Sequence, residues 1–137
     1  MKFVKLVTDG ACSQNGTQKG GWAYKLMYTT PSGRLVNSER SGAQEATTNQ
    51  QMELVATMEG LRALTEPCNI EVYTDSMYVI GLLNKGWKAK KNIELVTKLR
   101  EIASIHVIKC THVKGHSGDI DNEYVNEMAQ KEAGTWK

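Results

Sequence analysis

The sequence IEVYTDS occupies residues 70–76, and apolar residues alternate in it with polar ones before an acid and a serine. This alternation predicts a strand whose even-numbered residues share one face. Ser76 is a favourable residue for the start of a helix, so we expect the strand to end at Asp75. The sequence therefore predicts an acid at a junction between a strand and a helix, where α/β proteins place their ligand sites.

Two further acids occupy comparable places in the chain. The apolar run of residues 3–8 predicts a strand that ends at Asp9, which is followed at once by Gly10. Glu53 lies one turn into a stretch of helical pattern that opens at residues 47–49. All three acids are therefore expected at the ends of elements rather than in their middles.

The remaining elements complete the pattern of an α/β domain. Strands are expected over residues 3–11, 22–28, 34–41, 70–75 and 105–113, and helices over 49–65, 76–84, 93–103 and about 122–133. The resulting order, βββαβααβα, predicts a mixed five-stranded sheet with helices on both faces. A length of 137 residues without an internal repeat or linker predicts a single domain over residues 1–137.

Composition excludes some classes of protein and leaves others open. The net charge of +2 is too small to indicate a partner by itself. Three widely spaced cysteines fit a reducing cytoplasm better than a disulfide framework. The apolar start is too short for an export signal, and no segment approaches the length of a membrane span. We therefore expect a cytoplasmic monomer without a membrane partner, since nothing in the sequence argues for an oligomer.

A parallel arrangement of the two acid-ended strands would bring Asp9 and Asp75 to one edge of the sheet. Neighbouring strands lie about 4.8 Å apart, so the two carboxylates could share an ion, and a helix over that edge would add Glu53. Oxygen ligands without a nearby cysteine favour Mg²⁺ or Mn²⁺, and a pair of such ions suits phosphodiester hydrolysis. Taken singly, Asp9 fits a turn residue and Glu53 a favourable charge near a helix start. Jointly, the three acids favour a metal site.

Four motifs, in this order and spacing, resemble type 1 ribonuclease H. They are TDGAC at residues 8–12, TNQQME at 48–53, YTDS at 73–76 and VKGHSG at 113–118. The resemblance covers essentially the whole chain. It implies a five-stranded mixed sheet and a metal-dependent endonuclease that cuts the RNA strand of an RNA–DNA hybrid, leaving 5′-phosphate and 3′-hydroxyl ends.

The resemblance also implies roles for individual residues. Asp9, Glu53 and Asp75 match three of the four acids that hold two metal ions in this family. The fourth position falls at Asn126, whose amide oxygen can touch a metal but adds no charge. His116 matches a loop histidine associated with proton transfer or product departure, and glycines on either side fit a mobile imidazole.

Other positions match residues that contact the hybrid. Asn15, Asn49 and Gln50 match positions around the scissile strand, and Thr48 falls near a pocket for a phosphate of the DNA strand. Some relatives carry a basic helix and loop where this chain has only residues 85–91, here called the lysine segment. Its Trp87 and Lys88 are candidates for substrate contact. A solvated charge run with the tryptophan packed inward explains the segment equally well.

Three alternatives remain open at this point. Cys110, His112 and His116 have spacings seen in zinc sites, but a fourth ligand is missing nearby. Because Asn126 replaces an acid, the chain could bind hybrids while cutting them weakly or not at all. A third possibility is another nuclease or a transposase-like relative with the same fold and the same three acids.

Overall fold

The computed structural model describes residues 1–13, 19–114 and 119–136. Five strands are formed by β1 (Lys2–Cys12), β2 (Gly20–Thr29), β3 (Leu35–Gln44), β4 (Cys68–Thr74) and β5 (Val107–His112). Four helices are formed by α1 (Asn49–Arg62), α2 (Met77–Asn84), α3 (Ile93–Ala103) and α4 (Ile120–Ala133). The predicted order βββαβααβα is therefore confirmed, as is the α/β class.

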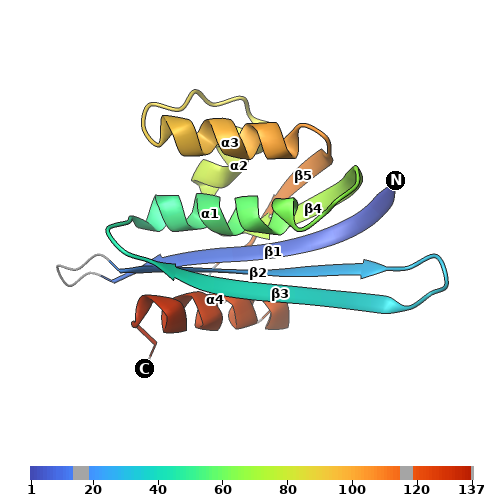
Figure 1. Cartoon of the computed structure of the whole chain (residues 1–137), viewed down its shortest axis with the longest axis horizontal. Coiled ribbons are helices and arrows are strands. Elements are labelled where there is room, and N and C mark those ends of the chain that lie inside the picture. Colours follow the sequence, from blue (N-terminus) through green and yellow to red (C-terminus); the bar gives the residue numbers. More distant parts are fainter. Residues whose placement is uncertain (14–18, 115–118, 137) are drawn as a thin grey trace.

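The strands form one mixed sheet in the order β3-β2-β1-β4-β5 (Figure 1). Strands β1, β2 and β3 make an antiparallel meander, whereas β4 pairs in parallel with β1 and with β5. The register places Val7 opposite Tyr73 at the last β1–β4 pair. The carboxyl ends of β1 and β4 consequently emerge at the same edge of the sheet.

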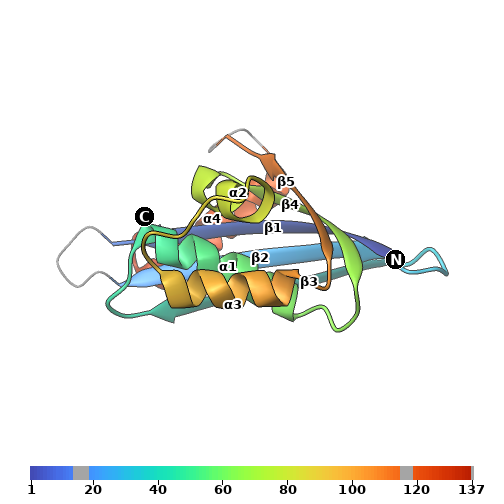
Figure 2. The same ribbon diagram turned by 90° about the horizontal axis from the view of Figure 1, so that it is seen from above.

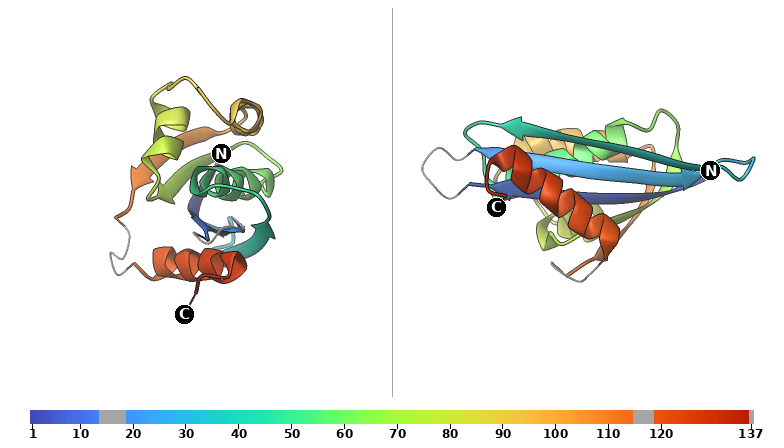
Figure 3. Two further views of the ribbon diagram at one scale, coloured as in Figure 1. Left: turned by 90° about the vertical axis from the view of Figure 1, so that its left-hand side faces the viewer. Right: turned by 90° about the horizontal axis from the view of Figure 1, so that it is seen from below.

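Helices cover both faces of the sheet, as predicted. Helices α1, α2 and α3 lie on one face and α4 lies alone on the other (Figures 1 and 3). The larger apolar core lies between the sheet and the three-helix layer, and includes Leu6, Leu26, Leu54, Val72 and Leu99. A smaller core lies under α4. Burial of the even-numbered residues of β4 follows the alternation seen in its sequence.

Glycine at position 21 lets helix α4 pack directly against the backbone of β2. A Cβ atom there would overlap the carbonyl oxygen of Ala129 and lie 2.6 Å from the amide nitrogen of Ala133. The last turns of α4 are thereby held against the sheet. This contact matters for the site below, since α4 carries Asn126.

The element ends differ from the sequence prediction by a few residues. Helix α1 ends at Arg62 rather than at residue 65, and α4 begins at Ile120, two residues early, because Asp119 caps it. The Asp119 side chain accepts a hydrogen bond of 3.0 Å from the backbone N–H of Asn122. Seen from above, α2 lies near β4 and β5, whereas α3 lies beside α1 (Figure 2). Among the described residues, no helix has the length and apolarity needed to cross a membrane.

Candidate metal centre

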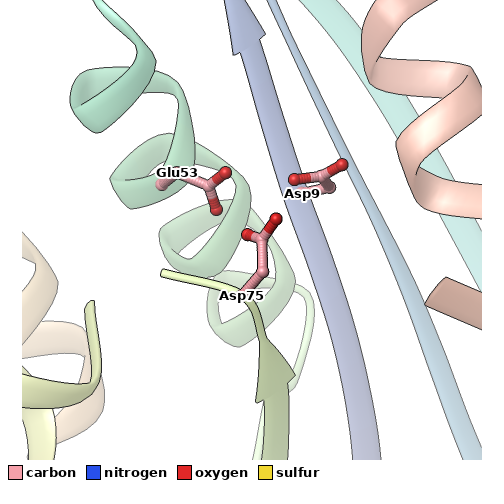
Figure 4. Close-up of side chains that lie close together, drawn as sticks. All are labelled: Asp9, Glu53 and Asp75. Carbon is pink, nitrogen blue, oxygen red and sulfur yellow. The ribbon is translucent and has the colours of Figure 1, made fainter. Parts of the chain in front are cut away.

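Three acids from three different elements converge at one edge of the sheet. Asp9 lies within β1, which does not end at Asp9 as predicted but continues to Cys12, because residues 9–12 stay paired with β2. Glu53 belongs to α1, and Asp75 follows the last residue of β4. Each offers a carboxylate oxygen, and these oxygens all lie within 4.8 Å of one another. The side chains point toward a common centre (Figure 4). Asp9, Glu53 and Asp75 are called the acid site below, and their convergence is as expected from parallel pairing of β1 and β4.

Close contact between α1 and β1 brings Glu53 into the acid site. The Thr48 hydroxyl caps α1 by accepting a hydrogen bond from the backbone N–H of Gln51. With the helix starting there, Glu53 lies one turn into it. A Cβ atom at position 10 would lie 2.5 Å from the Glu53 backbone nitrogen, so glycine permits this approach. The Gly10 amide donates to Asp9 Oδ1 at 2.9 Å and to Glu53 Oε1 at 3.0 Å. One backbone N–H therefore orients two of the three carboxylates.

The electrostatics of the acid site favour a bound cation. Burial, followed by the negative charges of Asp9 and Asp75, raises the pKa of Glu53 well above its usual value. Burial and the charge of Asp75 likewise raise the pKa of Asp9. Partial shielding of the Asp75 carboxyl group from water raises its pKa, although the residue as a whole is exposed. Glu53 Oε2 is buried without a hydrogen-bond partner among the described residues. A divalent cation would neutralise the repulsion and satisfy this oxygen, and three carboxylates are a donor set that suits Mg²⁺ or Mn²⁺.

The fourth position of the resemblance lies beside these acids. Asn126 on α4 donates from Nδ2 to Asp9 Oδ2 at 2.7 Å. Gln130, one turn later, donates from Nε2 to Asn126 Oδ1 at 3.2 Å. Asn126 thus turns its nitrogen, not its oxygen, toward the acid site. Gln130 was missed by the sequence reasoning, although its i+4 spacing from Asn126 was a usable signal.

A pocket opens around the acid site. Its lining includes all three acids, Asn126 and Gln130, together with Asn49, Lys19, Cys12 and the exposed Trp136. Asn49, one of the predicted substrate residues, therefore lies in the pocket wall beside the acids. Lys19 and Trp136 were not predicted, because neither belongs to a motif and only the folded chain brings them to this edge.

The other predicted substrate residues lie in varied settings. The Thr48 side chain is engaged as the cap of α1, and Gln50 is half-buried outside the pocket lining. Trp87 is 43% exposed, and its indole packs against Gly81, so the tryptophan is packed inward only in part. Lys88 is exposed and neither residue lines the pocket. Asn15 and His116 lie outside the described residues.

The zinc alternative gains no support from the described residues. Cys110 is half-buried in β5, and burial raises the pKa of its thiol to about 11. A zinc ligand must be a thiolate, which this setting disfavours. In the described part of the chain, the one cluster of at least three His, Cys, Asp or Glu side chains with metal-ligand spacing is the acid site.

Comparisons with known proteins agree with this geometry. A model of the RNase H family matches residues 1–134. Ribonuclease H of Chlorobium limicola is 40% identical over 144 aligned residues, which cover 95% of this chain and 94% of that protein. Ribonuclease H of Rhodopirellula baltica is 42% identical, with 93% of this chain and 89% of that protein covered.

Solved structures give the same result. The crystal structure of LC9-RNase H1, a type 1 RNase H with the type 2 active-site motif, matches with a TM-score of 0.86 and 27% identity, covering 100% of this chain and 74% of that one. RNase H1 of Halobacterium salinarum matches with a TM-score of 0.74 and 22% identity, over 96% of this chain and 98% of that one, and this supports the fold. The chain belongs to the ribonuclease H family.

Proposed function

We propose that this chain is a metal-dependent endoribonuclease that cuts the RNA strand of RNA–DNA hybrids and leaves 5′-phosphate and 3′-hydroxyl ends. The observation that carries the proposal is the convergence of three carboxylates within 4.8 Å in a chain of the ribonuclease H family. Named ribonucleases H at 40% identity or more, aligned over nearly their full lengths, support the same activity.

The acid site would hold two Mg²⁺ or Mn²⁺ ions through Asp9, Glu53 and Asp75. When bound, such ions activate the attacking water and stabilise the oxygen that departs from the phosphodiester. Asp9 and Glu53 are buried and oriented by Gly10, so they form the fixed floor of the site. Asp75 is exposed and faces the side from which a substrate phosphate can approach.

Residues around the acid site would position the hybrid. Asn49 lines the pocket beside the acids and offers an amide to the scissile strand. For Asn15, Gln50 and the phosphate contact of Thr48, the resemblance remains the support. His116 is proposed to assist proton transfer or product departure. A ribonuclease H distinguishes the two strands because the 2′-hydroxyl marks the RNA.

The experiment that tests this function compares four substrates. A labelled RNA–DNA hybrid, single-stranded RNA, duplex DNA and duplex RNA are each incubated with the protein and Mg²⁺, Mn²⁺ or a chelator. Cleavage confined to the RNA of the hybrid and abolished by the chelator is the expected result. Asp9→Asn serves as the inactive control. Binding of the hybrid without cleavage would instead identify a hybrid-binding module, and cleavage of duplex DNA would identify a different nuclease.

A further inference from the structure

Two amide side chains stand in line behind Asp9 on α4. Asn126 Nδ2 lies 2.7 Å from Asp9 Oδ2, and Gln130 Nε2 lies 3.2 Å from Asn126 Oδ1. The two amides are one helical turn apart, half-buried, and both line the pocket of the acid site. Their hydrogen bonds run in one direction, from Gln130 to Asn126 to Asp9.

The chemistry of the groups explains this direction. Asp9 Oδ2 accepts the hydrogen bond in this pair, and only the nitrogen of the Asn126 amide can donate it. The Asn126 oxygen then faces away and needs a donor, which Gln130 supplies. We propose that Gln130 is a positioning residue that holds the Asn126 amide in line with the acid site and stays hydrogen-bonded to it whichever end of that amide faces Asp9. In its bearing on metal binding, this inference rests on the function proposed above.

The backbone around Gln130 holds this arrangement in place. The amides of Thr135 and Trp136 both donate to the Gln130 carbonyl oxygen, at 2.9 and 3.3 Å. On the opposite side, the close contact at Gly21 fixes α4 against β2. These contacts define the backbone position from which the side chain of Gln130 reaches Asn126.

Glutamine has a property here that charged residues lack. Its amide carries both donors and an acceptor, so it can complement Asn126 in either orientation. With the nitrogen of Asn126 toward Asp9, Gln130 donates, as observed. With the oxygen of Asn126 toward a cation, Gln130 would accept. Asn126 can therefore donate to Asp9, as observed, or offer its oxygen to a cation, and Gln130 can remain its partner in both cases.

Ion binding to four proteins tests this inference without use of catalysis. Gln130→Glu supplies an acceptor only, which favours the Asn126 oxygen facing the acid site, but it also adds charge. The charge effect is measured by the same substitution in an Asn126→Ala background, so the cycle contains wild type, both single variants and the double variant. Calorimetric titrations with Mg²⁺ and Mn²⁺ are made without nucleic acid. Gln130→Glu should tighten binding about three- to tenfold more when Asn126 is present than when it is absent.

A spectroscopic signature gives a second, charge-free measurement. The side-chain amide signals of Asn126 are identified by their loss in Asn126→Ala. In Gln130→Met, which has a similar length without an amide, these signals should move toward the positions of free amides and exchange faster with water. Signals of the Asn122 side chain, which is buried on the same helix, serve as the internal control.

The outcomes separate this inference from the proposed function. An equal effect of Gln130→Glu in both backgrounds, or unchanged Asn126 signals in Gln130→Met, would overturn the positioning role. If wild type binds neither ion, the proposed metal-dependent function fails, and the Asn126 signals alone then decide the role of Gln130. The positioning role is supported if Gln130→Glu changes ion affinity more when Asn126 is present and if the Asn126 signals move in Gln130→Met.

Discussion

The acid site and the lysine segment both gather like charges, but they do so in opposite ways. The three carboxylates approach within 4.8 Å, and Asp9 and Glu53 are buried. The four lysines of residues 85–91 are all exposed. Buried like charges repel strongly and lose hydration, whereas exposed ones are screened by water and salt. A fold that keeps its acids together despite this cost indicates a ligand, while the exposed lysines fit several roles.

The largest expected effect comes from neutralising the most buried acid. Glu53→Gln keeps the shape of the side chain and removes one charge from the acid site. Affinity for Mg²⁺ or Mn²⁺, measured by calorimetry, should fall by roughly a hundredfold, and hybrid cleavage should fall with it. Glu59→Gln, which alters an acid in an ion pair with Arg62 on the same helix, is the matched control. Ion affinity that is equal in the two variants would refute a metal role for Glu53.

The same burial predicts an unusual dependence of stability on pH. The pKa values of Asp9 and Glu53 are raised above their ordinary 3.8 and 4.5. The folded protein therefore binds protons more tightly than the unfolded chain, and the stabilisation is complete below the ordinary pKa values. This stabilisation is lost as the pH rises through the pKa values of the folded state. The loss is about 1.4 kcal/mol for each tenfold difference in proton affinity between the folded and the unfolded chain.

Urea unfolding with chelator present, from pH 4 to pH 8, measures this loss. Asp121, whose pKa is lowered mainly by Lys25, contributes with the opposite sign, so wild type is compared with Glu53→Gln. The difference in unfolding free energy between the two should change across this range and should shrink when Mg²⁺ saturates the wild type. A difference that does not vary with pH would contradict the mutual repulsion inferred for the acid site.

How far the sequence predicts this molecule depends on the feature. Period-two alternation in residues 70–74 predicted both β4 and its buried face, because a half-buried strand has few other patterns. The meeting of Asp9 with Asp75 followed from parallel pairing, which a strand–helix–strand connection strongly favours. These features depend on local pattern and on general topology, and both are present in a single sequence.

Other parts of the site depend on spatial neighbours that no local pattern records. The orientation of Asn126 follows from which donors and acceptors surround it, namely Asp9 on β1 and Gln130 on its own helix. The resemblance placed the amide oxygen of Asn126 near the metal, whereas in the structure the amide nitrogen faces Asp9. Likewise, the roles of Gly10 and Gly21 as points of close approach appear only once α1 and α4 are packed on the sheet.

A smaller effect is expected from restoring a fourth acid. Asn126→Asp replaces the hydrogen-bond donor to Asp9 by a charge, so four carboxylates would face the pocket. Divalent-ion affinity should rise about three- to tenfold, and the chelated protein should become less stable because a like charge is added to a crowded site. Calorimetry and urea unfolding measure the two changes. Superimposable titration curves for the two proteins would count against a place for Asn126 at the metal centre.

The smallest effect is expected from the lysine segment, because exposed charges act on a substrate only through its phosphates. Replacing Lys88, Lys90 and Lys91 by alanine should weaken hybrid binding several-fold. The slope of log Kd against log salt concentration should also fall, by up to about 0.9 for each phosphate that the protein no longer neutralises. Binding is measured at several salt concentrations with chelator present. Alanine at Arg34, Arg62 and Lys109, which are also exposed, removes the same charge elsewhere. If both triple variants give the same salt slope, the lysine segment is a solvated charge run. Of the two charged regions, only the acid site would then bind a ligand.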